Sequence, residues 1–124
     1  MNLVDSSAWL AYFADESGAD RFLPALKDAT ALVVPTVVVY EVFKVVLRER
    51  DADYALRAAA AMHRGTVVEL TSELAMAASR LSLEYALPMA DSIVLATAQA
   101  YEATVWTLDA HFKALPNVKY FPRR

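Results

Sequence analysis

MNLVDSSAWLAYF, from Met1 to Phe13, places an apolar run, an acid and a helix start in immediate succession. The apolar run Asn2 to Val4 predicts a short strand that stops at Asp5. Ser6 or Ser7 is expected to cap the helix that follows, because a hydroxyl oxygen accepts a hydrogen bond from a free N–H of the first turn. A carboxylate therefore stands at the junction between a strand and a helix.

The rest of the chain continues this alternation of strand and helix. Further strands are expected at Leu32–Val34, which Pro35 closes, at Thr66–Leu70, at Thr104–Leu108 and, as a last edge strand, at Val118–Phe121. Further helices are expected at Gly18–Lys27, Thr36–Leu47, Ala52–His63, Ser72–Ala86 and Pro88–Tyr101. This alternation predicts an α/β fold with a short, mostly parallel central sheet and helices on both of its faces.

One segment, Thr36 to Leu47, carries signals for both kinds of structure. Its many valines favour a strand. Its spacing favours a helix, because apolar residues from Val39 to Leu47 recur every three or four positions, with Glu41, Lys44 and Arg48 on the other side. The preceding proline is also a favourable entry to a helix. We interpret the segment as a helix.

The bulk composition predicts one domain, residues 1–124, with an apolar surface that something covers. A chain of 124 residues is typical of a single domain. It has no cysteine, which excludes disulfides and thiolate metal sites and fits a cytoplasmic location. The hydrophobic fraction is 57%, yet no apolar run approaches the ~20 residues of a membrane span, and the acid at position 5 does not suit a signal peptide. We expect a partner or a second copy to cover the apolar excess.

The charge of the chain restricts how it can bind nucleic acid. The formal net charge is −3, whereas a general nucleic-acid binder usually carries a basic excess. Any nucleic-acid role must therefore depend on local positive charge and on a bound metal ion.

Four acids are expected at one rim of the sheet. Asp5 follows the strand NLV and Asp109 follows the strand TVWTL, and ligands of such folds bind beyond the carboxyl ends of the strands. Glu41 and Asp91 each lie early in a helix that can open at the same rim. Asp91 stands in LPMADSIVLATA among largely apolar neighbours, where an acid is costly to bury unless it is paired or bound to metal.

Carboxylates gathered in this way suit one kind of chemistry. Hydrolysis of a phosphodiester needs an activated water and neutralisation of charge on the phosphate. Magnesium and manganese ions supply both, and they prefer carboxylate oxygens and water as ligands. Two such ions about 3.5–4 Å apart can stabilise the attacking and leaving oxygens together. The four acids could supply the carboxylates that this chemistry needs. The alternative interpretation is that they are ordinary solvated surface charges, like most of the 15 acids of the chain.

Four blocks of the sequence resemble the motifs of PIN domains. They are VDSSAWLAYF at Val4–Phe13, YE at Tyr40–Glu41, MADSIVLATA at Met89–Ala98 and TLDAHF at Thr107–Phe112. A single block is a weak signal, but the four in this order are specific. Their spacing and the total length resemble the VapC ribonuclease toxins of prokaryotic toxin–antitoxin pairs, and the resemblance covers essentially the whole chain.

The resemblance implies a function and a set of site residues. The acidic quartet of the family, which holds metal and carries catalysis, matches Asp5, Glu41, Asp91 and Asp109. Ser7 matches a hydroxyl that supports the first aspartate, and Thr107 matches the small hydroxyl residue before the last. The family cuts RNA with Mg²⁺ or Mn²⁺, usually as a homodimer, and a cognate antitoxin silences it. This chain is thereby expected to be an endoribonuclease of the type II toxin class.

Position 111 departs from the family, and one alternative function stays open. Many members carry a further aspartate where His111 stands, and a histidine adds less negative charge, which leaves open whether one or two metals bind. A surface histidine at a helix start is the simpler interpretation. The alternative function is a catalytically inactive PIN-like module that binds a partner. The presence of all four acids counts against it.

Overall fold

Five short strands form one sheet within residues 1–123, the part of the chain that the computed structural model describes. The strands are β1 (Asn2–Val4), β2 (Leu32–Pro35), β3 (Thr66–Val68), β4 (Thr104–Thr107) and β5 (Val118–Tyr120). Every pairing is parallel, and the order across the sheet is β3-β2-β1-β4-β5. The first strand of the chain is therefore the central one, between β2 and β4.

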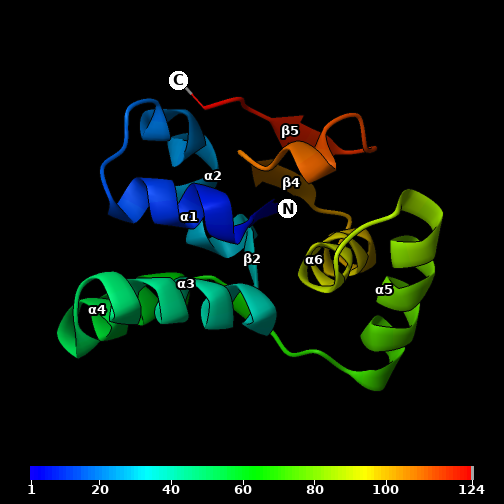
Figure 1. The fold of residues 1–124 in the computed structure, drawn as a ribbon, viewed down its shortest axis with the longest axis horizontal. Coiled ribbons are helices and arrows are strands. Elements are labelled where there is room, and N and C mark those ends of the chain that lie inside the picture. The colour runs from blue at the N-terminus through cyan, green and yellow to red at the C-terminus, as the bar shows by residue number, and fades with distance from the viewer. Residues whose placement is uncertain (124) are drawn as a thin grey trace.

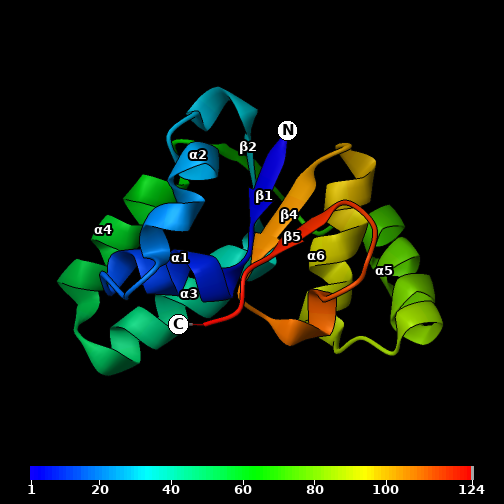
Figure 2. The same cartoon turned by 90° about the horizontal axis from the view of Figure 1, so that it is seen from above.

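Helices cover both faces of this sheet. They are α1 (Ser6–Phe13), α2 (Leu23–Leu26), α3 (Thr36–Glu49), α4 (Ala52–Met62), α5 (Ser72–Tyr85) and α6 (Met89–Ala100), with short 3-10 helices η1 (Ala19–Phe22), η2 (Ala29–Ala31) and η3 (Ala110–Phe112). Figures 1 and 2 show α1, α3 and α4 on one side of the strands and α5 and α6 on the other. The predicted α/β fold, a parallel sheet with helices on both faces, is confirmed. Within residues 1–123, no helix combines the length and the apolar character that crossing a membrane requires.

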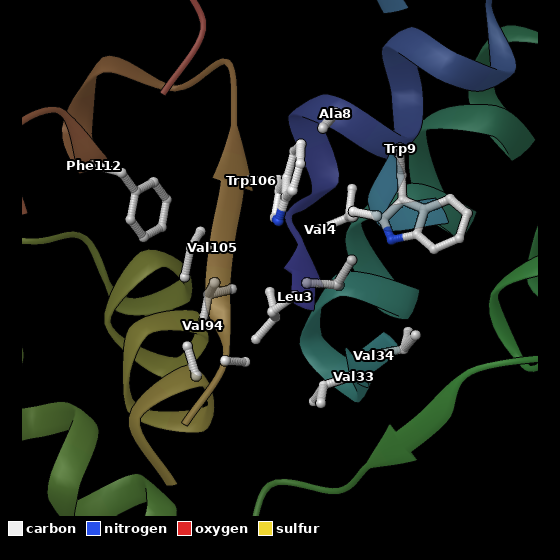
Figure 3. Close-up of a cluster of buried hydrophobic side chains, with 14 of the residues drawn as sticks. Leu3, Val4, Ala8, Trp9, Val33, Val34, Val94, Val105, Trp106 and Phe112 are labelled. Atoms are coloured by element: carbon white, nitrogen blue, oxygen red, sulfur yellow. The ribbon is translucent and has the colours of Figure 1, made fainter. Parts of the chain in front are cut away.

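The core lies along the central strands, which are apolar on both faces because helices cover both. Leu3 pairs with Val33 on one side and with Val105 on the other, and all three side chains are fully buried. Figure 3 shows this cluster, with Val94 of α6 next to the strands on one side and Trp9 of α1 on the other. This packing holds the ends of β1 and β4, and the residues that follow them, in place.

The start of α1 differs from the sequence-based expectation. Neither Ser6 nor Ser7 is its cap, since both already lie in the first helical turn. The cap is Asp5, which has the extended backbone of such a position (φ −79°, ψ 176°) and accepts a hydrogen bond from the Ala8 N–H. Because the strand ends at Val4 and the helix begins at Ser6, only one residue is available to cap it.

Other elements are shorter or rotated relative to the prediction. Gly18–Lys27 contains η1 and the single turn of α2 in place of one helix. Thr36–Leu47 is indeed helical, as part of α3, but its buried side chains are Val38 and Val42. Leu47, expected on the apolar stripe, is 45% exposed. The valine-rich sequence is compatible with a strand or a helix. The packing of α3 against α1 and α4 determines which of its side chains are buried.

Candidate active site

The candidate site lies where the chain leaves β1 and β4. Val4 pairs with Trp106, so Asp5, the first residue after β1, lies level with Thr107, the last residue of β4. Asp109 follows two residues after Thr107, and the first turn of α6 carries Asp91. Figure 2 shows this edge of the molecule, where α1 begins, β4 leads into η3 (orange) and α6 starts. The topology therefore brings residues that are distant in the sequence to one rim.

Asp5 is the most buried acid of the site, and its carboxylate is held by three donors. Asp5 is only 4% exposed to solvent. Its Oδ1 accepts hydrogen bonds from the Ser7 hydroxyl at 2.7 Å and from the Ala8 N–H at 3.1 Å, and its Oδ2 accepts one from Thr107 Oγ1 at 2.6 Å. A carboxylate has about four lone-pair positions. Among the described residues, three are used, so Oδ2 keeps one for a further partner.

Burial has a large effect on the ionisation of Asp5. Loss of solvent raises its pKa from 3.8 to about 6. The hydrogen bonds from Thr107, Ser7 and Ala8 act against this rise, and the nearby charge of Asp109 adds to it. Ionised Asp5 is therefore unfavourable in the metal-free protein, and a bound cation would stabilise its charge.

Two hydroxyl groups connect the ends of β1 and β4. Thr107, fully buried, donates to Asp5 and accepts a 2.8 Å hydrogen bond from the Asp109 N–H. Ser7 donates to Asp5 and accepts a 3.1 Å hydrogen bond from the Leu108 N–H. Each hydroxyl thus ties the first acid to the backbone that leads to the last one. These contacts set the position of Asp109 relative to Asp5.

Asp91 and Asp109 both contact the same ring nitrogen of His111. Nδ1 of His111 is 2.8 Å from Oδ2 of Asp91 and 3.3 Å from Oδ1 of Asp109. One donor atom from each of these three residues lies within 4.8 Å of the other two. Burial raises the pKa of Asp91, although the hydrogen bond with His111 lowers it, and the same hydrogen bond raises the pKa of His111.

Glu41 lies close enough to Asp91 and Asp109 to interact with their charges. It lies on α3 and is half-buried. Loss of solvent raises its pKa, a side-chain hydrogen bond with Ser6 opposes the rise, and the charges of Asp91 and Asp109 add to it. Within residues 1–123, however, its carboxylate is outside the trio that shares ligand-like distances. The four predicted acids are thus gathered at one rim, with Asp91 and Asp109 the pair that the ring of His111 joins.

The donor set fits a hard divalent cation. Carboxylate oxygens are the ligands that Mg²⁺ and Mn²⁺ prefer, and Asp91 and Asp109 already lie at suitable distances around a shared neighbour. Asp5, which like Glu41 lies outside the trio of close donor atoms among the described residues, keeps one lone pair, and both add negative charge to the rim. The raised pKa values of Asp5, Glu41 and Asp91 all report the cost of crowding carboxylates away from water. A bound cation would remove that cost.

Sequence reasoning missed two contacts at this rim. His111 is an exposed histidine at the start of a short helix, as interpreted from the sequence, but the contacts of its ring with Asp91 and Asp109 were not predicted. The block TLDAHF places it near the site, but the sequence contains no signal for the direction of its ring. The interaction of Ser6 with Glu41 was also unexpected, because the two residues come from different helices.

The family of the chain is indicated by its sequence. The pattern of the PIN domain family matches residues 3–118. A comparison with curated proteins gives no match.

Solved structures share the fold over nearly the whole chain. A chain of a toxin–antitoxin complex from Klebsiella pneumoniae has a TM-score of 0.84 and 20% identity, covering 98% of this chain and 99% of that one. VapC20 of Mycobacterium tuberculosis, described as a toxin that cleaves the sarcin–ricin loop, has a TM-score of 0.81 and 19% identity, covering 98% and 100%. VapBC2 of Rickettsia felis, bound to a promoter DNA fragment, has a TM-score of 0.74 and 15% identity, covering 98% and 97%.

Proposed function

This chain belongs to the PIN domain family, and we propose that it is a metal-dependent endoribonuclease, the toxin of a type II toxin–antitoxin module. The observation that carries the proposal is the crowding of acids at the ends of β1 and β4. Asp5, Glu41 and Asp91 all have a raised pKa, and the charge of Asp109 contributes to each rise. Structural neighbours that are toxins or parts of toxin–antitoxin complexes support the same class.

Each acid has its own part in the proposed reaction. Asp5, Asp91 and Asp109, with Glu41, hold Mg²⁺ or Mn²⁺. A bound cation of this kind supplies positive charge against the phosphate of RNA and makes water a stronger nucleophile. Glu41 is half-buried and lies outside the trio of close donor atoms, and we assign it the acceptance of a proton from the attacking water. Ser7 and Thr107 keep the carboxylate of Asp5 in one orientation through their hydrogen bonds.

RNA must be attracted by local charge, because the chain is net acidic. Lys44 and Arg48 follow Glu41 by three and seven residues on α3, a spacing that puts side chains on one helical face. Both are exposed. They are the cations of α3 best placed to contact phosphates that flank the scissile bond.

The test is cleavage of single-stranded RNA by the purified chain after treatment with a chelator. We expect no cleavage without metal, cleavage after Mg²⁺ or Mn²⁺ is added, and none by Asp109→Asn under either condition. Asp20→Asn, an exposed acid on η1, is the matched control and should cleave like the wild type. A folded wild type that cleaves no RNA with either metal would favour the alternative, an inactive PIN-like module that binds a partner.

The proposed regulator is a cognate antitoxin with a basic, flexible tail. The acidic rim can be occupied by a metal ion or by an incoming arginine, whose planar fork contacts carboxylates bidentately. We expect Mg²⁺ to weaken binding of such a tail more than sodium chloride at matched ionic strength, since salt alone screens charge. The Asp5→Asn/Asp91→Asn double variant should bind the tail less well. Equal effects of the two salts, with normal binding by the double variant, would contradict inhibition through this rim.

The proposed assembly is a homodimer in the cytoplasm. An open groove along α3 is lined by four apolar side chains and by the stems of Lys44 and Arg48, and Tyr40 and Leu47 there are 61% and 45% exposed. In this proposal a second copy covers the apolar side chains and leaves the charged ends of Lys44 and Arg48 open to RNA, as long cationic side chains commonly do. Large exposed apolar areas commonly mark protein contacts. A second copy of the chain is the occupant that the family resemblance implies.

A further inference from the structure

We propose that His111 is itself a ligand of the metal, and that its imidazole nitrogen shifts the preference of the site from Mg²⁺ toward Mn²⁺ and other transition ions. This inference rests on the proposed function, because it requires a metal at the acidic rim. It concerns position 111, where the resemblance to the family implies an aspartate and this chain has a histidine.

The position of the ring nitrogen carries the inference. Nδ1 of His111 lies 2.8 Å from Oδ2 of Asp91 and 3.3 Å from Oδ1 of Asp109. Adjacent ligands of an octahedral ion with bonds of about 2.1 Å lie about 3 Å apart. The nitrogen is therefore separated from both carboxylates by distances that adjacent ligands of one ion would have. In the metal-free protein the same nitrogen makes a hydrogen bond with Asp91, and a bound ion would take the place of that contact.

The local backbone holds the ring in this place. Asp109 caps η3, and its Oδ1 accepts a 2.9 Å hydrogen bond from the backbone N–H of His111. The next residue, Phe112, is fully buried and anchors the turn in the core. The His111 side chain is nevertheless 59% exposed, so an ion can reach it from solvent. Asp91 reaches the same nitrogen from the first turn of α6.

The chemistry of the donor decides the selectivity. Mg²⁺ strongly prefers oxygen ligands and keeps several waters. Imidazole nitrogen suits transition ions. Mn²⁺ shares with Mg²⁺ the preference for carboxylate oxygen, but as the softer, transition-metal ion of the two it accepts an imidazole more readily. Replacing one carboxylate of an all-carboxylate site by His111 therefore lowers the affinity for Mg²⁺ more than the affinity for Mn²⁺. His111→Asp should restore the preference for Mg²⁺.

The chain provides a matched control in its second histidine. The sequence has two histidines. His63 follows α4, and its Nδ1 lies 2.8 Å from the backbone carbonyl oxygen of Ala59. His63→Ala removes an imidazole of the same kind from a place where it contacts a carbonyl group.

The experiment is pulsed electron paramagnetic resonance of the full chain loaded with Mn²⁺, together with calorimetric titration of Mn²⁺ and Mg²⁺. We expect a nitrogen coupling to Mn²⁺ in the wild type and in His63→Ala, and its loss in His111→Ala. His111→Ala should weaken Mn²⁺ binding by roughly tenfold or more, while Mg²⁺ binding should change much less. His111→Asn keeps a polar side chain but has no imidazole, and it should behave like His111→Ala. It provides a second test if His111→Ala does not fold.

Each other outcome has a definite meaning. Mn²⁺ that binds the wild type without a nitrogen coupling, or a coupling that survives in folded His111→Ala or His111→Asn, would overturn the assignment of His111 while leaving the metal site intact. Equal losses of Mn²⁺ and Mg²⁺ affinity would overturn the selectivity. A folded wild type that binds neither ion would instead refute the proposed function.

Discussion

Replacing Asp5 by asparagine is expected to stabilise the metal-free protein at neutral pH by an amount that depends on pH. Asparagine has nearly the same shape as a protonated aspartate and carries no charge. Its amide oxygen can accept from Ser7 and Ala8 as Oδ1 of Asp5 does, and its amide nitrogen can donate to the hydroxyl oxygen of Thr107. The substitution therefore removes a buried charge and keeps most of the surrounding hydrogen bonds.

The magnitude follows from the pKa of Asp5. Burial raises it from 3.8 to about 6, and a difference of this size corresponds to roughly 3 kcal/mol of unfolding free energy. Below pH 3.8 the group is protonated in both states, and its favourable contribution is fully present. As the pH rises toward about 6, the unfolded chain loses its proton before the folded one does, so the wild type loses this stability. Asparagine does not titrate and avoids the loss.

The assay is urea unfolding in a chelating buffer at several pH values between about 4 and about 8. The quantity to compare is the unfolding free energy of Asp5→Asn minus that of the wild type. We expect this difference to be small near pH 4, to grow up to about pH 6, and to level off near 3 kcal/mol. Asp20→Asn, an exposed acid on η1, is the control and should show no such rise.

A constant difference between pH 4 and pH 8, or one that shrinks as the pH rises, would refute the reasoning. The first result would mean that burial of Asp5 does not disfavour its charge. The second would mean that the hydrogen bonds of Thr107, Ser7 and Ala8 outweigh burial and hold the pKa below its ordinary value.

Three further predictions concern the same rim and the assembly. Asp91→Asn should abolish RNA cleavage yet leave the metal-free fold as stable as before or slightly more so, because burial raises the pKa of Asp91; a variant that unfolds in urea far earlier would make Asp91 a structural partner of His111. Thr107→Val should lower the unfolding free energy by roughly 1.5–3 kcal/mol, since it removes a hydrogen bond to a charged group, and Thr107→Ser should recover most of that loss; equal stability of the valine variant would contradict the role of this hydroxyl. Light scattering at micromolar concentration should report a dimer of the isolated chain, and a monomer would count against a second copy on the groove of α3.

Much of the fold was predictable because it depends on local patterns. Short apolar runs that alternate with helical stretches indicated a parallel sheet, and all five strands lie where these runs occur. The positions of Asp5 and Asp109 followed from the same patterns, because each comes directly after a strand end or close to it. Helix boundaries were less certain. The two serines after Asp5 both suit a cap, and only the point at which the strand ends made Asp5 the residue that caps α1.

Contacts between elements could not be predicted in this way. His111 and Asp91 are twenty residues apart and meet only because α6 starts beside η3. The choice of the inward face of α3 likewise depended on its packing against α1 and α4.

The sequence by itself determined the order of the elements, the parallel sheet and the identity of the acids at its rim, since periodicity and strand ends are properties of neighbouring residues. Only the tertiary structure decided that Thr107 and Ser7 bridge Asp5 to the end of β4 and that the ring of His111 joins Asp91 to Asp109. The physical reason is that a hydrogen bond or a metal ligand must be placed to within a few tenths of an ångström. That precision comes from register between strands and from packing of helices on the sheet.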